Sequence, residues 1–439
     1  MTRTRRGGGP AAVTTPIRSL SSWSFSLQTR CPARSSLIPS KPFRLVGAKC
    51  SPGVDDVLAI LLALASPEVE VALITLVFGN THAINTRDNL LKMYYQLARE
   101  REAHPGAKER YPLANRTVVA VGEDAPIGGE KHVATYFHGR DGLSNISETN
   151  PEFTPPAGTE YPLEISQKSA RDEILQLLAS EPEGSVTIVA LGPLTNVAHA
   201  YRADKATFAR IGEVVWMGGA LDVPGNTSPV AEFNSFADPY AFDMLRLAAK
   251  AGEFSFVFAP LDITARHTVP FPDLLHEGGT PLEAFTTAFL LRVRGLQKRF
   301  GLPDAMEMHD PVAVWYAVEN APGTTSAEWE VTGREFGVER SGEITRGMCV
   351  VDRRGTGETE GKKRTEDEGL LNDIPMPATK AQASETHFPK PEANVSPNGE
   401  AEAEDEPEKS KALPKAITRT PGSAALRVKL LSRVFGATV

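Results

Sequence analysis

Residues 51–65 read Ser-Pro-Gly-Val-Asp-Asp-Val-Leu-Ala-Ile-Leu-Leu-Ala-Leu-Ala, an acidic turn that leads directly into an apolar helix. Gly53 permits a tight turn, and Asp55 and Asp56 fall in the first helical turn, where they complement unpaired backbone N–H groups. Helix capping explains many such acids, but it does not explain two adjacent carboxylates after a Pro-Gly turn. Clustered oxygen ligands suit a hard cation such as calcium, so this stretch predicts a metal-binding turn at a strand end.

Outward from this turn, apolar runs rich in Val, Ile and Phe alternate with helical patterns. Such short runs are typical of strands that are covered on both faces. The predicted strands are Val69–Gly79, Thr117–Val121, Val186–Leu191, Glu213–Gly219 and Phe254–Leu261. The predicted helices are Val54–Ala65, Ile84–Arg99, Ser169–Ala179, Leu194–Tyr201 and Pro239–Ala251. This alternation predicts an α/β fold with an open, doubly wound, mainly parallel sheet and flanking helices, whose ligands bind beyond the carboxyl ends of the strands.

A second acidic helix start lies far downstream, in Met306-Glu-Met-His309-Asp310-Pro311. Asp310 begins a predicted helix, and Pro311 suits its first position. A single His-Asp pair is usually structural. Beside another acidic helix start, however, His309 is a candidate proton donor near neutral pH.

A third cluster combines Trp216-Met217-Gly218-Gly219 with three polar side chains, Asn226, Glu232 and Asn234. The glycines allow backbone to approach a ligand, and the polar side chains can bind sugar hydroxyls. An Asn- and Gly-rich loop that forms its own turns explains the same residues. Both interpretations are open from this cluster alone.

Composition limits the kinds of partner. The 439 residues carry a formal charge of −8, and residues 1–49 contain nine Lys or Arg and no acid, so the remaining chain is strongly acidic. An acidic body argues against nucleic-acid binding. The longest apolar run, Val57 to Ala65, is too short for a membrane span. Three widely spaced cysteines suit a reducing compartment, and we expect a cytoplasmic protein.

Four segments follow from the composition. Residues 1–45 are read as a disordered basic tail, with a mitochondrial transit peptide or a mis-joined segment as alternatives. Residues 46–354 form the main domain, and residues 355–414, rich in Glu, Lys and Pro, are read as a disordered low-complexity insertion. Residues 415–439 are predicted to end in a helix, capped by Ser423, that packs back on the main domain through Leu426, Leu430, Leu431 and Val434.

Taken together, several segments resemble the inosine–uridine preferring nucleoside hydrolase family. The matching segments, in order, are Pro52-Gly-Val-Asp-Asp56, Phe78-Gly-Asn-Thr81, His138-Gly-Arg-Asp-Gly-Leu143, Ala190-Leu-Gly-Pro-Leu-Thr-Asn196, Met217-Gly-Gly219, Ala231-Glu-Phe-Asn234, Pro260-Leu-Asp-Ile-Thr264 and His309-Asp-Pro311. Each motif is weak alone, but eight in order are specific. The resemblance implies a nucleoside hydrolase fold and calcium-dependent hydrolysis of the N-glycosidic bond of ribonucleosides to ribose and free base.

The resemblance also implies roles for particular residues. The calcium ligands would be Asp56, Asp310 and the backbone carbonyl of Thr195. The ribose would be bound by Asp55, Asn80, Asn226, Glu232 and Asn234, with Met217 lining its pocket. His309 would lie near the departing base as a candidate acid, and His138 matches a pocket histidine. The family is often dimeric or tetrameric, which implies a homo-oligomer.

One position departs from the family pattern. Family members usually read Asp-x-Asp-Pro-Gly-x-Asp-Asp, whereas this chain reads Lys49-Cys-Ser51-Pro-Gly-Val-Asp-Asp56. Ser51 therefore occupies the position of the general base and calcium ligand, and a neutral hydroxyl cannot accept the proton of the attacking water. Either the residues before about position 50 come from a mis-joined exon or wrong start, or the chain is a non-catalytic descendant that binds nucleosides or a partner.

The motifs do not distinguish purine from pyrimidine bases as the substrate's base. Another N-riboside, such as nicotinamide riboside, is a further option for the substrate.

Overall fold

A central sheet organises the molecule, and in the computed structural model it is formed by strands from both ends of the chain. The structure describes residues 43–50, 53–112, 117–320, 326–354 and 412–438, all of which belong to one compact unit. Within these residues the sheet has nine strands in the order β10-β13-β7-β6-β5-β1-β2-β3-β4. All neighbouring pairs are parallel except β10 with β13, so the predicted doubly wound, mainly parallel sheet is confirmed.

Five strands, β2, β3, β5, β6 and β7, correspond to the five apolar runs predicted as strands. The strands of the sheet are β1 (Phe43–Cys50), β2 (Val69–Leu76), β3 (Thr117–Val121), β4 (Leu163–Ile165), β5 (Val186–Ala190), β6 (Glu213–Met217), β7 (Phe256–Ala259), β10 (Glu330–Gly333) and β13 (Lys415–Arg419). Two small antiparallel pairs lie outside it, β8 (Thr268–Pro270) with β9 (Ala305–Glu307) and β11 (Gly337–Val338) with β12 (Cys349–Val350).

The helices vary from single turns to the long α2 and α13. They are α1 (Val54–Leu64), α2 (Ala83–Ala103), α3 (Pro105–Arg110), α4 (Thr135–His138), α5 (Ile146–Thr149), α6 (Ala170–Ser180), α7 (Thr195–Ala203), α8 (Lys205–Phe208), α9 (Phe233–Ala237), α10 (Pro239–Lys250), α11 (Leu261–Thr264), α12 (Phe271–Leu274), α13 (Pro281–Arg299), α14 (His309–Glu319) and α15 (Ser423–Leu430), with a 3-10 turn η1 (Pro151–Phe153) and a π-helical turn η2 (Leu431–Phe435). No helix of the described residues has the length and apolar character that a membrane span needs.

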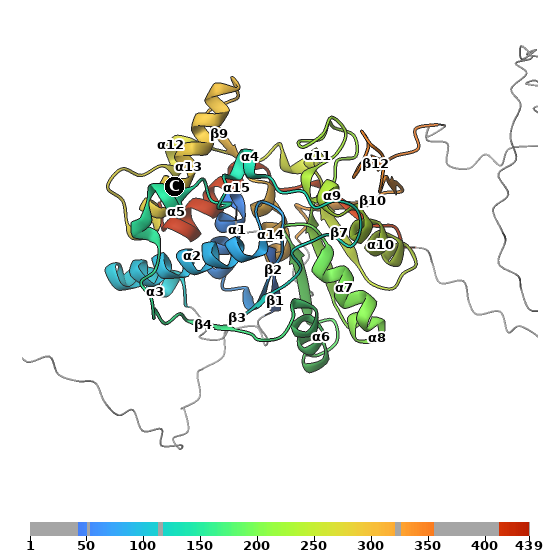
Figure 1. The fold of residues 1–439 in the computed structure, drawn as a ribbon, viewed down its shortest axis with the longest axis horizontal. Helices are drawn as coiled ribbons and strands as arrows, with labels where there is room; N and C mark the ends of the chain where they lie inside the picture. Colours follow the sequence, from blue (N-terminus) through green and yellow to red (C-terminus); the bar gives the residue numbers. More distant parts are fainter. Residues whose placement is uncertain (1–42, 51–52, 113–116, 321–325, 355–411, 439) are drawn as a thin grey trace, which may run out of the picture. The chain divides into compact units, whose positions relative to one another are not determined.

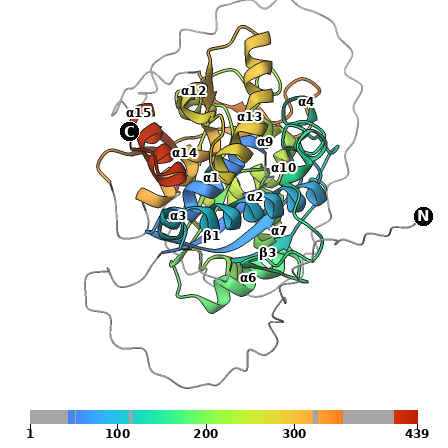
Figure 2. The same ribbon diagram turned by 90° about the vertical axis from the view of Figure 1, so that its left-hand side faces the viewer.

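Helices cover both faces of the sheet (Figures 1 and 2). Successive residues of a strand point to opposite faces, so Val189 and Val215 pack with α1 and α14, whereas Ile188 and Trp216 pack with α6, α7 and α10. This alternation divides the buried side chains into two main hydrophobic clusters, one on each face. It explains why the strands of the sequence are almost continuously apolar.

The strand order reverses between β1 and β5. From β1 the chain adds β2, β3 and β4 on one side, and then continues from β5 to β6 and β7 on the other. In sheets of this kind, ligands bind at such a reversal, beyond the carboxyl ends of the strands. The acidic turn after β1 lies at this point.

Two segments differ from the sequence-based expectations. Residues 43–45, which the sequence assigned to the disordered basic tail, belong to β1, which pairs with both β2 and β5, although its register with β2 shifts twice. The C-terminal segment contributes not only a helix but also β13, which lies between β10 and β7. The low apolar content of Lys415–Arg419 explains why the strand pattern was not recognised.

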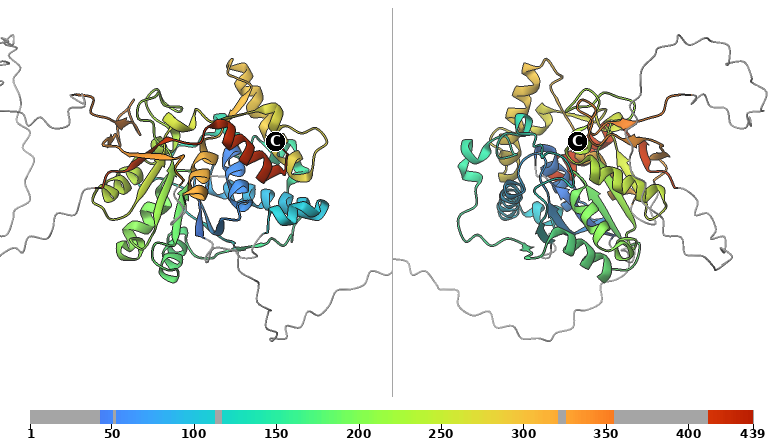
Figure 3. Two further views of the ribbon diagram at one scale, coloured as in Figure 1. Left: turned by 180° about the vertical axis from the view of Figure 1, so that it is seen from behind. Right: turned by 45° about the vertical axis from the view of Figure 1, so that its right-hand side comes forward.

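The C-terminal helix packs as predicted, with Leu426, Leu430, Leu431 and Val434 buried in the same cluster as α1 and α14. Figure 3 shows α15 in red against these helices. The expected cap by Ser423 is wrong, because its hydroxyl donates to the Thr268 carbonyl and accepts from the Thr268 N–H instead. Ser423 therefore fixes the start of α15 to β8.

Candidate active site

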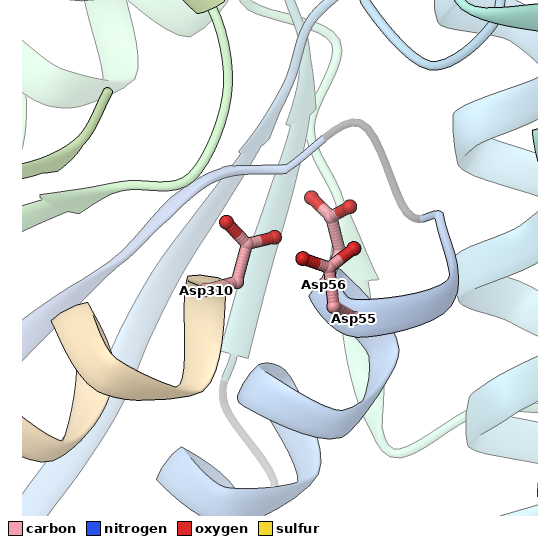
Figure 4. Close-up of side chains that lie close together, drawn as sticks. All are labelled: Asp55, Asp56 and Asp310. Carbon is pink, nitrogen blue, oxygen red and sulfur yellow. The ribbon is translucent and has the colours of Figure 1, made fainter. Parts of the chain in front are cut away.

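Three carboxylates from two helix starts converge beyond the end of β1. Asp55 and Asp56 lie in the first turn of α1, and Asp310 lies in the first turn of α14, which packs against α1. One oxygen from each carboxylate lies within 4.8 Å of the others. Figure 4 shows the three side chains directed toward a common space. Residues more than 250 positions apart in the sequence are thus brought together, as the metal-turn interpretation requires.

Asp56 is held in place by neighbouring groups. Its Oδ2 accepts hydrogen bonds from the Gly53 N–H at 3.1 Å and from Asn80 Nδ2 at 2.7 Å. Its Oδ1 is buried and has no hydrogen-bond partner among the described residues. A Cβ atom on Gly53 would lie 2.3 Å from Asn80 Nδ2 and 2.7 Å from His138 Nδ1, so only glycine allows this close packing.

The electrostatics of the cluster favour a bound cation. Burial and the neighbouring Asp55 raise the pKa of Asp56 well above its usual range. Burial, Asp55 and Asp56 do the same to the pKa of Asp310. Like charges in a buried site repel one another, and a divalent cation removes this repulsion. The unpartnered Oδ1 of Asp56 and the all-oxygen donor set therefore fit a hard cation.

A cavity of about 350 Å³ opens beside the acid cluster, and most of the predicted site residues line it. The predicted residues among its lining are Asp55, Asn80, His138, Met217, Asn226, Glu232, Asn234, His309 and Asp310. They come from the starts of α1, α9 and α14, the end of α4, the end of β6 and the loops after β2 and β6. The cavity therefore joins the three clusters that the sequence showed separately.

Glu232 and Asn234 are ordered by backbone contacts. The Glu232 carboxylate accepts hydrogen bonds from the N–H groups of Gly219, Asn234 and Ser235 at 2.7–3.0 Å, and it thereby caps α9. Burial nevertheless raises its pKa. Asn234 Nδ2 donates to the Met217 carbonyl at 3.0 Å and to the Leu191 carbonyl at 3.3 Å. The polar side of the cavity is thus held by backbone hydrogen bonds of β5 and β6.

Asn226 accepts a hydrogen bond from the Phe233 N–H at 2.9 Å, which fixes its amide at the cavity.

His138 is buried, and its Nδ1 has no hydrogen-bond partner within the described part of the chain. Burial lowers the pKa of His138 to about 4, against the opposing charge of Asp55. His138 is therefore neutral near pH 7.

His309 has a partner at each ring nitrogen. Its Nδ1 lies 2.9 Å from Thr264 Oγ1, and its Nε2 lies 3.0 Å from Glu307 Oε2. Burial alone would lower the pKa of His309, but the hydrogen bond to Glu307 and the charges of Asp55 and Glu232 raise it overall. A raised pKa favours the protonated form of the imidazole, which is the form that the predicted proton donor needs.

Of the predicted residues that the structure describes, Asp56 and Thr195 are not among those that line the cavity. Thr195 begins α7 and is fully buried, and its hydroxyl donates to Asp238 Oδ2 at 2.7 Å. It does not line the cavity, and the role of its carbonyl as a metal ligand stays a prediction. Ser51 lies outside the described residues.

Sequence reasoning missed one wall of the cavity. We define the apolar wall as Phe137 of α4 together with Leu296, Phe300, Leu302 and Met306 of α13 and the following segment. Glu307 was also missed, although it precedes His309 by two residues, the spacing that places side chains on one side of an extended chain. The apolar wall had no comparable signal, because its residues come from α4, α13 and the segment after α13, and they form no motif in the sequence.

The chain matches known sequences over most of its length. Residues 48–374 match the profile of the inosine-uridine preferring nucleoside hydrolases. A pyrimidine-specific ribonucleoside hydrolase from Klebsiella pneumoniae is 32% identical over 309 residues, which cover 69% of this chain and 86% of the relative. The corresponding enzyme from Salmonella agona is 33% identical over 307 residues, with the same coverage.

Solved structures share the fold. A plant nucleoside hydrolase has a TM-score of 0.63 at 23% identity, and 90% of this chain and all of that chain are covered. A purine-preferring ribonucleoside hydrolase from Gardnerella vaginalis has a TM-score of 0.61 at 21% identity, with 90% and 98% coverage. An inosine-guanosine nucleoside hydrolase has a TM-score of 0.57 at 25% identity, with 72% and 89% coverage.

Proposed function

The chain belongs to the inosine-uridine preferring nucleoside hydrolase family, and from this premise we propose that its cavity hydrolyses ribonucleosides of the inosine or uridine type with calcium bound. The observation that carries the proposal is the convergence of Asp55, Asp56 and Asp310 beside a cavity lined by hydrogen-bonding groups. The products are ribose and the free base. This is an N-glycosyl hydrolase reaction.

The metal site is proposed from its donors. Asp56 and Asp310 supply carboxylate oxygens, and the Thr195 carbonyl is the further protein ligand. Calcium rather than magnesium is proposed, because calcium tolerates irregular sets of many oxygen ligands. When bound, the ion orients the ribose hydroxyls and the attacking water.

The protein groups have separate tasks in bond cleavage. Breaking the C1′–N bond develops positive charge on the ribose, as in other glycoside hydrolyses. The carboxylates of Asp55 and Glu232 lie beside the cavity and stabilise that charge, and Asn80, Asn226 and Asn234 orient the sugar through hydrogen bonds. His309 gives a proton to the departing base, while Met217 and His138 limit the space around the ribose.

The proton of the attacking water needs an acceptor, and Ser51 cannot serve as one. A general base contributes typically about 10²–10⁴-fold to the rate, or about 3–5 kcal/mol of the barrier. Ser51 is therefore the reason for a second candidate function beside hydrolysis, which is nucleoside binding without turnover. The two candidates share the cavity and differ only in catalysis.

Both candidates are tested by one substrate panel. We expect Ser51→Asp to release base from uridine or inosine at least about 10²-fold faster than the native chain, and a calcium chelator to abolish the release. The measurement is chromatographic detection of base and ribose. A native chain that binds a nucleoside but never turns it over favours the binding function. If Ser51→Asp with calcium bound leaves uridine, cytidine, inosine, guanosine, adenosine and nicotinamide riboside intact, the hydrolase proposal is wrong.

A further inference from the structure

Glu307 lies at the cavity beside His309 and has no role in the function proposed above. It ends β9, two residues before His309, and both side chains line the cavity. Its Oε2 lies 3.0 Å from His309 Nε2, while Thr264 Oγ1 lies 2.9 Å from Nδ1 on the other side of the ring. The imidazole is therefore held between two side chains.

The chemistry of the two partners determines where the ring carries hydrogen. An ionised carboxylate only accepts hydrogen bonds, so Nε2 must carry the hydrogen that it shares with Glu307. A hydroxyl can donate or accept, so Thr264 pairs with Nδ1 whether or not that nitrogen is protonated. As long as the ring pairs with Glu307, Nε2 therefore carries a hydrogen inside the cavity.

A purely structural role for the Glu307 side chain is a poor explanation. The side chain is 48% exposed, and ion pairs of that exposure contribute about 0–1 kcal/mol. Pairing of β9 with β8 uses the backbone, since Glu307 is in register with Thr268, and it needs no carboxylate. The position of the side chain in the cavity thus calls for a functional explanation.

We propose that Glu307 is a positioning residue, which holds the His309 ring so that Nε2–H faces the departing base. This inference rests on the proposed hydrolase function. In the step it supports, the C1′–N bond breaks and its electron pair stays with the base. The His309 Nε2–H bond also breaks, and a new N–H bond forms on the base. Water supplies the oxygen on C1′, and its released proton passes to the solvent or to a base at position 51.

The ring stays in place after the transfer. His309 is left neutral with its hydrogen on Nδ1, where Thr264 Oγ1 accepts it. Glu307 is half exposed, so its side chain can move aside when a base nitrogen takes over the Nε2–H group. The contribution of Glu307 therefore appears only with leaving groups that need a proton.

The test compares two leaving groups in the Ser51→Asp background. Inosine needs protonation of its base, whereas the nitrophenolate of 4-nitrophenyl riboside leaves as a stable anion. Glu307→Leu should lower kcat for inosine by at least about tenfold, within the ~10²–10⁴-fold contribution of a general acid, and leave kcat for the nitrophenyl riboside unchanged. Glu307→Gln should keep most of the inosine rate, because its amide oxygen still accepts from Nε2–H.

Asp304→Asn is the matched control. Asp304 lies on the same segment and pairs with Arg294, but it does not line the cavity. It should change neither rate. Equal losses on both substrates in Glu307→Leu, or a faster inosine reaction because the carboxylate competed with the base, would overturn the proposal.

A second readout does not depend on activity. In the native chain with labelled histidine, NMR should detect an Nε2–H proton of His309 protected from exchange with water, assigned by its loss in His309→Asn. The signal should persist in Glu307→Gln and disappear in Glu307→Leu. If the Nε2–H signal persists in Glu307→Leu, the positioning role is wrong. If the signal behaves as expected but Ser51→Asp cleaves no nucleoside, the positioning role stands and only the hydrolase function is wrong.

Discussion

Single residues show how burial and neighbouring charges shift the pKa values of the side chains around the cavity. Asp56 and Asp310 have raised pKa values because they are buried beside other carboxylates, while His309 keeps a raised pKa because Glu307 lies against it. His138 is the opposite case, with a pKa of about 4, because burial outweighs the single charge of Asp55. The pKa values of the two cavity histidines are thus shifted in opposite directions, that of His138 down and that of His309 up.

The depressed pKa of His138 predicts a loss of stability in mild acid. In the unfolded chain the imidazole binds a proton below about pH 6.5, whereas in the folded chain it does so only near pH 4. The unfolded state therefore binds more protons between these values, and the free energy of unfolding falls as the pH drops. The shift corresponds to a contribution on the order of 3 kcal/mol.

We expect His138→Gln to reduce this acid sensitivity, since glutamine does not titrate. Urea unfolding of the native chain and the variant at pH 7 and pH 4.5 measures the effect. Parallel loss of stability in the two proteins would show that other groups cause it.

The sequence motifs identified residues that the fold gathers around one cavity. Nine of the predicted residues line the cavity because the motifs lie directly at strand ends and helix starts, where a parallel sheet gathers side chains. Glu307 and Thr264 were not assigned roles, since their importance depends on the distance to His309. Distances between segments cannot be read from one sequence.

Elements are predictable where burial makes the pattern strong. The central strands β5 and β6 and the helix α1 match the apolar runs closely, because both faces of the sheet are covered. The strand β13 was not predicted, since only Ala416 and Ile417 of its five residues are buried. Its assignment depends on pairing with β7 and β10 from distant parts of the chain.

The packing of α15 makes a prediction at this scale. Leu430 is fully buried in the cluster that includes α1 and α14, whereas Val428 of the same helix is 44% exposed. Leu430→Ala should lower the free energy of unfolding by about 2–5 kcal/mol, because it leaves a cavity in the core. Val428→Ala should change it by no more than about 0.5 kcal/mol.

Chemical denaturation of both variants gives the measurement. Similar values for Leu430→Ala and Val428→Ala would mean that the C-terminal helix does not support the main core.

At the scale of the whole molecule, the reversal of strand order explains why the site lies where it does. The acidic turn follows β1, and Thr195 follows β5, so both lie at the carboxyl ends of the two strands that flank the reversal. The alternation of strands and helices in the sequence was sufficient to predict a doubly wound, mainly parallel sheet, although it did not predict the strands β4, β10 and β13. The apolar wall was not predictable, because its residues come from α4, α13 and the segment after α13, outside the central sheet.

The central claim concerns one ion and one sugar, and a crystal soaked with calcium and ribose tests it directly. The anomalous signal should show a single calcium bound by carboxylate oxygens of Asp56 and Asp310, with ribose hydroxyls in the adjoining cavity. Asp310→Asn should weaken or remove the calcium peak. An ordered ribose elsewhere, or full calcium density that ignores these carboxylates, would contradict the account.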